Sequence, residues 1–411
     1  MKIFGPVCLI ALVFLPALTA LPSQTVRTNS YREGYRSGEI CVRLQFGVDI
    51  NEINARYGTY TKERIPGTPI YLLGLPPGRD LEKLMGRMQT DFNLLFADFN
   101  HKFQLPEVRQ TSHAFIDQVS QAFIDGQSPV KFYGQQSVWN LNLDEAHKFS
   151  RGFGVRVAVI DTGLDFNHSL FEGRIAWPVY DFVDDDGNPS DVLYGSASGH
   201  GTFVAGLIAL TAPDAKIIPL RAFNSDGRGT SFDIAKAIRF ATNVGADVIN
   251  MSFGMLEEDK LITDALRYAY QRVHMVASAG NDNLNTIQFP ADTANFTLSV
   301  TSTTTNDIKA TFANYNSKMN AAAPGVSLYS AYPGERWAWW SGTSFSTALV
   351  TGESALLLSL KTDLKSENLN RIIILSGINL DPLNPEYKNK LGRRIDYRAA
   401  IEMLLSNPQT Y

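Results

Sequence analysis

Residues 157–163 of this 411-residue chain read Val-Ala-Val-Ile-Asp-Thr-Gly, an apolar run that stops at a carboxylate and a glycine. Strands that are buried on both faces of a parallel sheet have this composition. Similar runs recur through residue 360 and alternate with helical patterns of 10–15 residues, which predicts an α/β fold with helices flanking a parallel sheet. Functional groups in such sheets gather beyond the carboxyl ends of the strands. Asp161 therefore stands where a functional residue is expected.

Two further blocks supply an imidazole and a hydroxyl. Residues 199–206 read GHGTFVAG and residues 341–348 read SGTSFSTA, so that His200 and Ser344 both open predicted helices. Serine is a weak nucleophile unless a neighbouring base takes its proton, and that base must itself be held by a third group. The chain order Asp161, His200, Ser344 is one of three unrelated orders known for this geometry. The sequence predicts a hydrolase with a serine nucleophile.

These blocks resemble the motifs of the subtilisin-like serine proteases, the subtilases. The family pattern D-T/S-G matches residues 161–163, H-G-T-x-V-A-G matches residues 200–206, and G-T-S-x-A/S matches residues 342–346. The resemblance covers roughly residues 139 to 405 and implies a subtilisin-like catalytic domain over that range.

The resemblance implies a role for each catalytic residue. Ser344 attacks a peptide carbonyl, His200 takes up its proton and returns it to the leaving amine, and Asp161 holds the imidazole. Asn281, which follows Ala279 and Gly280, resembles the asparagine of the family's oxyanion hole. A side-chain amide that donates to the tetrahedral oxyanion contributes ~3–4 kcal/mol.

The resemblance also implies a cleft in which an extended peptide is added as a strand. Glycine is expected in its walls because the substrate backbone must approach closely. The wall residues are Ser252, Phe253 and Gly254 on one side and Gly227 and Gly229 on the other. By the family's register, Gln288 lies at the floor of the first specificity pocket, where a neutral polar floor favours broad specificity. The alternative is that Gln288 is an ordinary loop residue.

Catalysis by this triad needs no cofactor, but a structural Ca²⁺ is expected in an acidic loop. Asp181, Asp184 and Asp186 lie at i, i+3 and i+5 in a turn-rich segment, and Ca²⁺ takes six to eight oxygen ligands from such runs. The segment resembles a calcium loop of thermitase-like subtilases at these three positions. The alternative is a solvated acidic loop.

The N-terminal region predicts export. Residues 1–20 read as a secretory signal peptide, with a lysine, an apolar run and small residues at its end. An uncleaved anchor over residues 3–20 is the alternative. We expect a secreted or periplasmic protein that has no membrane segment after signal cleavage. Of the two cysteines, Cys8 lies in the signal, and Cys41 is expected to be a buried strand residue without an internal disulfide.

Between the signal and the catalytic region, residues 21–37 are polar and predict a linker, and residues 38–105 predict a small α+β module of ferredoxin-like character. This module resembles subtilase prodomains, which implies that it assists folding, inhibits the site and is cut off. A permanent binding domain is the alternative. Residues 106–138 are expected to be a linker that carries Ala-Phe-Ile-Asp twice, at 114–117 and 122–125. We expect the cut between residues 100 and 139.

Composition limits the partners. The chain has 44% hydrophobic and 19% charged residues and a net charge of −4, with no basic run, which argues against nucleic-acid binding. The expected partners are protein or peptide substrates and the chain's own prodomain, and the expected state is a monomer. Two alternatives remain: a non-catalytic peptide-binding pseudoprotease, and a serine esterase or transpeptidase on the same triad.

Overall fold

Nine strands form the central sheet of the computed structural model, which describes residues 34–108, 121–126 and 128–406. The strand order is β16-β17-β13-β12-β11-β10-β6-β8-β7, and all neighbours run parallel except β16 and β17. The strands are β6 (Arg156–Asp161), β7 (Tyr180–Asp181), β8 (Lys216–Arg221), β10 (Val248–Met251), β11 (His274–Ser278), β12 (Leu298–Thr303), β13 (Ala321–Pro324), β16 (Ile378–Asn379) and β17 (Arg393–Arg394).

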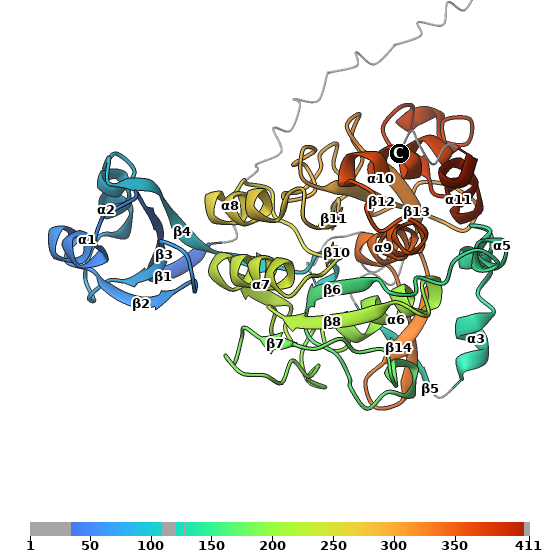
Figure 1. Cartoon of the computed structure of the whole chain (residues 1–411), viewed down its shortest axis with the longest axis horizontal. Helices are drawn as coiled ribbons and strands as arrows, with labels where there is room; N and C mark the ends of the chain where they lie inside the picture. The colour runs from blue at the N-terminus through green and yellow to red at the C-terminus, as the bar shows by residue number, and fades with distance from the viewer. Residues whose placement is uncertain (1–33, 109–120, 127, 407–411) are drawn as a thin grey trace, which may run out of the picture. The chain divides into compact units, whose positions relative to one another are not determined.

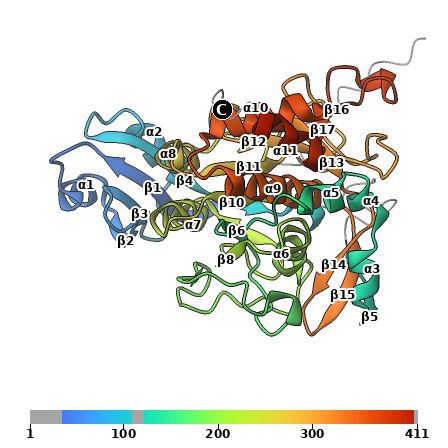
Figure 2. The same cartoon turned by 45° about the vertical axis from the view of Figure 1, so that its right-hand side comes forward.

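Both faces of this sheet are covered by helices (Figures 1 and 2), as the continuous apolar strands predict. Val157 and Val159 of β6 pack in a core with α6 (His200–Thr211) and α9 (Thr343–Leu360). Ala158 and Ile160 face the other way, into a core with α7 (Ser231–Asn243) and α8 (Lys260–Ala269). The alternation along one strand thus fixes two hydrophobic layers, and the predicted α/β class is confirmed.

The N-terminal module is the predicted α+β unit of ferredoxin-like character, with the element order βαββαβ. Its elements are β1 (Tyr35–Leu44), α1 (Ile50–Tyr57), β2 (Tyr60–Arg64), β3 (Ile70–Gly74), α2 (Leu81–Met88) and β4 (Leu94–Gln104), and the strand order is β2-β3-β1-β4. Asp49 and Asp80 cap the two helices by accepting from backbone N–H groups, as their positions before apolar runs predict. Cys41 is a buried residue of β1.

One face of this module packs on its own helices and the other packs on α7 and α8. Ile40 and Val42 lie in the module's core, whereas Cys41 and Leu72 belong to the core that contains α7 and α8. Lys236 of α7 pairs with Glu63 of β2 at 2.6 Å. The module and the catalytic region therefore share a hydrophobic interface.

The boundaries of the module differ from the prediction at its start. The first strand begins at Tyr35, inside the predicted linker 21–37. At the other end, β4 runs to Gln104 within the predicted module and pairs with β9 (Arg228–Thr230). The expected linker 106–138 contains η1 (Pro106–Val108), β5 (Phe123–Gly126), α3 (Pro129–Tyr133) and α4 (Gln136–Trp139). That segment is therefore not a plain linker. The signal 1–20, residues 21–33 and the Ala-Phe-Ile-Asp copy at 114–117 lie outside the described residues.

The second Ala-Phe-Ile-Asp copy forms β5, which joins a hairpin that leads to the nucleophile block. The hairpin is β14 (Leu328–Tyr332) and β15 (Arg336–Trp340), and β5 pairs antiparallel with β15. Asp125 of this copy accepts from the Trp339 indole at 3.2 Å. The remaining described elements are α5 (Leu143–His147), η2 (Ser169–Phe171), α10 (Ser366–Ser376), η3 (Pro385–Tyr387) and α11 (Tyr397–Ser406).

Candidate active site

Asp161 and His200 meet because one ends a strand and the other begins a helix beside it. Asp161 is the last residue of β6, and its Oδ1 accepts from the Thr162 backbone N–H and faces His200 Nδ1, both at 2.8 Å. Burial alone lowers the pKa of His200, but the Asp161 and Glu107 carboxylates outweigh it and raise the pKa to about 10. The imidazole in this arrangement is an imidazolium.

Ser344 lies in the first turn of α9, one residue after the helix begins. Its Oγ donates to the Ser252 carbonyl oxygen at 3.1 Å, while His200 Nε2 faces Glu107 Oε2, also at 3.1 Å. Asp161, His200 and Ser344 are each 0% exposed. The structure thus gathers the three predicted residues in a closed site in which a carboxylate, and not the serine hydroxyl, faces the imidazole.

Asn281 lies beside the nucleophile with its amide held in one orientation. Its Oδ1 accepts from the Thr343 backbone N–H at 3.0 Å and from Thr343 Oγ1 at 2.8 Å. That leaves Nδ2 to donate to Glu107 Oε1 at 3.0 Å, and the Ser344 backbone N–H points to the same oxygen at 3.4 Å. Two N–H donors converging on one oxygen form the geometry of an oxyanion hole.

Asp191, which the sequence analysis did not single out, ties the acid block to the histidine helix. Its Oδ1 accepts from Thr162 Oγ1 at 3.2 Å and from the Gly199 N–H at 3.1 Å. Its Oδ2 accepts from the Thr202 N–H and hydroxyl. Burial raises the pKa of Asp191 to about 6 despite these hydrogen bonds, which lower it. No spacing rule pointed to it, because its partners lie on two separate segments.

The predicted cleft walls flank an extended segment of the chain itself. Phe103 pairs antiparallel with Gly229, Gln104 forms an antiparallel bridge with Gly254, and the Leu105 N–H donates to the Gly227 carbonyl at 2.9 Å. The other two predicted wall residues are both buried: Ser252 accepts from Ser344, and Phe253 packs edge-on against Phe103.

Gln288 lies between the two backbone segments that border this cleft. Side chains built at Gly254 or Gly280 would collide with it. Its Nε2 donates to Asp282 Oδ2 at 2.6 Å, and its Oε1 is buried without a partner among the described residues. The Gln288 side chain therefore packs closely against the backbone at Gly254 and Gly280.

The acidic loop carries its counter-charge on the neighbouring strand. Arg221 Nη1 lies 2.5 Å from both Asp181 Oδ2 and Asp184 Oδ2. Asp181 Oδ1 also accepts from the backbone of residues 183 and 184, and Asp186 Oδ1 accepts from the Asn188 N–H at 2.8 Å. Because the guanidinium takes the cation's position between two carboxylates, this arrangement does not fit a calcium ion. The calcium expectation stays untested.

Among the described residues, one other group of side chains has the composition of a metal site. Asp98, His101 and Asp259 lie close together, but they bind one another and the backbone. His101 Nδ1 lies 2.8 Å from Asp259 Oδ2, and Asp98 Oδ2 accepts from the Lys260 N–H at 3.1 Å. Asp259 also caps α8. This cluster joins β4 to the start of a helix, and we assign it a structural role.

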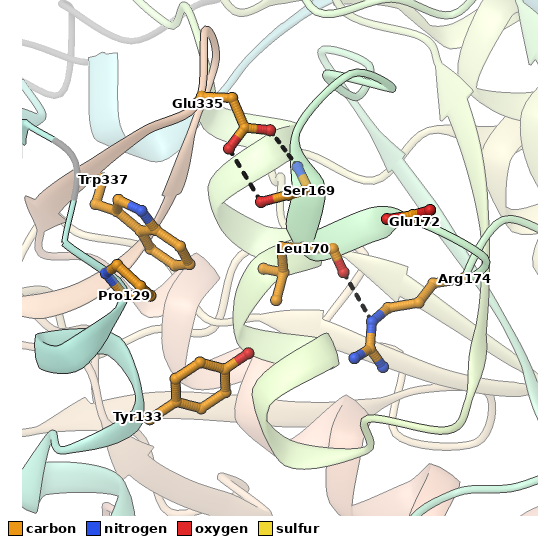
Figure 3. A pocket seen from close by; sticks show the side chains of 8 residues that line it. All are labelled: Pro129, Tyr133, Ser169, Leu170, Glu172, Arg174, Glu335 and Trp337. Carbon is orange, nitrogen blue, oxygen red and sulfur yellow. Dashed lines mark hydrogen bonds between the residues drawn. The ribbon is translucent and has the colours of Figure 1, made fainter.

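A cavity of about 550 Å³ lies apart from these residues, between α3, η2 and the β14–β15 hairpin. Figure 3 shows Glu335 directed at Ser169 and Arg174 at the Leu170 carbonyl, the latter with a hydrogen bond of 2.7 Å. None of the predicted site residues lines it. This cavity is therefore separate from the predicted substrate cleft, which residues 103–107 occupy.

Comparison with known proteins identifies the class. Residues 152–392, more than half of the chain, match the Subtilase family, and residues 22–100 match the fervidolysin N-terminal prodomain. The chain therefore belongs to the subtilase family, and its catalytic region is that of a subtilisin-like serine endopeptidase preceded by a prodomain. The resemblance seen in the sequence is confirmed.

Two curated relatives each match a little more than half of this chain. Thermitase of Thermoactinomyces vulgaris is 35% identical over 238 residues, which cover 55% of this chain and 82% of thermitase. The thermophilic serine proteinase of Bacillus sp. (strain AK1) is 37% identical over 239 residues, 55% of this chain but 57% of that protein. The chain thus spans little more than half of one curated relative and most of another.

Comparison with solved structures shows that this chain is also similar to known subtilisin-like proteins in its fold. Fervidolysin from Fervidobacterium pennivorans, described as a keratinolytic enzyme related to subtilisin, matches with a TM-score of 0.73 and 21% identity over 90% of this chain and 61% of its own. A cold adapted subtilisin-like serine proteinase matches with a TM-score of 0.54 and 30% identity over 60% of this chain and 89% of its own. In the part of the chain that the structure describes, no helix is long and apolar enough to cross a membrane.

Proposed function

We propose that the chain is a secreted serine endopeptidase, synthesised as an inactive precursor, that hydrolyses peptide bonds through an acyl-enzyme. The observation that carries the proposal is the convergence of Asn281 Nδ2 and the Ser344 N–H on a single oxygen next to His200. An oxygen held by two N–H donors beside an imidazole is the environment that an acyl-transfer oxyanion requires.

The chemistry follows from the positions of these groups. With the cleft free, neutral His200 accepts the proton of Ser344 Oγ while that oxygen attacks the peptide carbonyl. Asp161, bound to the imidazole through Nδ1, stabilises the imidazolium that forms. The amine leaves with the proton from His200. Water then attacks the ester in the same way and releases the acid and the free serine.

The substrate is proposed to bind as an added antiparallel strand, as residues 103–105 do in the precursor. Gly227, Gly229 and Gly254 supply backbone partners along such a peptide. Gln288 closes the first specificity pocket, so we expect this pocket to accept only small substrate side chains. This specificity is narrower than the broad specificity predicted from the sequence. Export rests on the signal pattern of residues 1–20.

The first test compares intact masses and peptide hydrolysis for the wild type and the Ser344→Ala variant, expressed side by side. We expect a shortened wild type that hydrolyses casein-derived peptides and a full-length, inactive variant. A wild type that is folded but never hydrolyses peptides would contradict the proposal and favour a peptide-binding role. Added amine nucleophiles that capture most of the acyl group would instead indicate a transpeptidase.

A further inference from the structure

Glu107 occupies the centre of the candidate site, although it lies outside the residues that match a prodomain and outside the catalytic domain match. It is 0% exposed. Each of its carboxylate oxygens has a catalytic partner: Oε1 binds Asn281 Nδ2 and the Ser344 N–H, and Oε2 binds His200 Nε2. Because both oxygens of this buried carboxylate have partners in the candidate site, the side chain is held in one position there.

The local sequence explains how Glu107 reaches this position. Residues 102–105 follow the cleft as an antiparallel strand, and the next residue is Pro106. Proline has no N–H to continue the pairing. The chain turns there into η1, closed by the Val108 N–H bonding the Leu105 carbonyl at 3.2 Å. The turn directs the Glu107 side chain, and no peptide carbonyl of the segment, at the two donors of the hole.

The opposite wall of the site lies close to the Glu107 carboxylate. A side chain at Gly342 would collide with the Glu107 carboxylate. His200 packs against the Trp340 and Phe345 rings, which carry no charge. The charged groups that face His200 are Asp161 from β6 and Glu107 from η1, and Asp191 binds the backbone at the start of α6.

We propose that Glu107 is an internal inhibitor that acts through its side chain: its carboxylate fills the oxyanion hole and at the same time holds His200 protonated. The precursor then lacks both the hole and the base, and the segment that lies in the cleft is not cut while this contact persists. Processing must wait for Glu107 to leave. This inference rests on the proposed function, since it concerns control of that site.

The first experiment avoids catalysis altogether. In the full-length Ser344→Ala precursor labelled with ¹⁵N-histidine, the His200 ring signals, assigned with a His200→Gln variant, are titrated by NMR. We expect the Glu107→Gln change to lower the pKa of His200 by about 1–3 units, because a facing anion within hydrogen-bond distance shifts a pKa by that much. An unchanged titration in folded protein would overturn the proposal.

The second experiment measures processing in precursors that keep Ser344, refolded from denaturant at equal concentration. Intact mass and peptide hydrolysis are followed in time. We expect Glu107→Gln to shorten the lag about tenfold, since a hydrogen bond to a charged group is worth about that factor. Glu52→Gln, which removes an exposed prodomain carboxylate in the first turn of α1, outside the interface with α7 and α8, should keep the wild-type lag within about twofold.

The outcomes separate the two proposals. Equal lags for wild type and Glu107→Gln, with normal hydrolysis, would overturn the role of Glu107 and leave the endopeptidase intact. If no precursor hydrolyses peptides but Glu107→Gln still lowers the pKa of His200, only the endopeptidase proposal is overturned. If Glu107→Gln fails to fold, Glu107→Asp takes its place, because its shorter carboxylate cannot reach both partners. It too must shorten the lag, or the proposal fails.

Discussion

At the scale of single residues, the candidate site depends on side chains that orient the reacting groups as much as on those groups themselves. Thr343 fixes which end of the Asn281 amide faces the hole, and Asp191 holds Thr162 and the start of α6 in register with Asp161. Leaving a buried hydrogen-bond acceptor of this kind unpaired costs free energy, so these hydrogen bonds restrict the site to one geometry.

Gln288 gives a prediction at the same scale. Replacing it with glycine removes the side chain that lies between Gly254 and Gly280, so the first pocket opens. We expect the ratio of kcat/KM for phenylalanine over alanine at P1 to rise about ten- to hundredfold, as a pocket gains room for apolar groups. A library of peptides varied at P1 measures this ratio.

The matched control is Gln288→Met, which keeps a side chain of similar length but lacks the amide. It should retain the preference for small residues. If glycine and methionine at position 288 both leave the P1 profile of the wild type unchanged, Gln288 does not form the pocket floor.

At the scale of elements, strand register decides how the acidic loop is neutralised. The ends of β7 and β8 are neighbours, and the register places Asp181 directly beside Arg221. Asp181 is buried at the start of the loop, and the same guanidinium reaches out to the exposed Asp184. The neighbouring strand therefore provides a positive charge to two of the loop's carboxylates.

This arrangement predicts that chelation leaves the loop unaffected. The test uses the Ser344→Ala precursor and a variant of it that also carries Asp186→Asn. EDTA should leave the difference between their two melting temperatures unchanged. Arg221→Gln should cost about 3–5 kcal/mol of unfolding free energy, because it leaves the buried Asp181 charge unpaired. A fall in melting temperature with EDTA that Asp186→Asn abolishes would instead establish calcium in the loop.

At the scale of the whole molecule, the prodomain is bound to the catalytic region over two kinds of surface. Its sheet shares an apolar core with α7 and α8, and the continuation of β4 enters the cleft. The first contact provides affinity through buried apolar area, whereas the second reaches the catalytic groups. The interior of the catalytic region also encloses titratable side chains that have no counter-charge, and these make the stability of the molecule depend on pH.

His274 at the start of β11 is the clearest case. Both of its ring nitrogens are buried without partners among the described residues, and burial lowers its pKa to about 3. Above the ordinary pKa of about 6.5 neither folded nor unfolded protein binds this proton. As the pH falls from there to about 3, only the unfolded chain takes it up, so stability decreases through that window.

We therefore expect His274→Val, in the Ser344→Ala background, to lose less unfolding free energy than its parent between pH 8 and pH 4.5. The difference should be on the order of 2–3 kcal/mol, from about 1.4 kcal/mol per unit over the two units below 6.5. Urea titrations at both pH values measure it. Buried Asp191 and Glu353, whose pKa values burial raises, act in the opposite direction but equally in both proteins. Identical pH dependence in the two proteins would refute the prediction.

The fold and the catalytic blocks were accessible from the sequence because their signals are local. The apolar runs of β6, β10 and β11 show burial on both faces, and Asp49 and Asp80 mark helix starts within a few residues. The pairing of the last residues of β4 with β9, outside their own module, was not predicted. A pattern in one segment carries no information about a partner strand more than a hundred residues away.

The sequence by itself determined the α/β class, the subtilase family and the residues that the catalytic motifs name, because motif and strand end coincide at Asp161 and motif and helix start coincide at His200 and Ser344. Only the tertiary structure decided which groups these residues meet. Glu107 binds the backbone of a residue 237 positions further along, and strand register places Arg221 beside Asp181. Such contacts arise from chain topology and burial, which bring together charges that no local pattern relates.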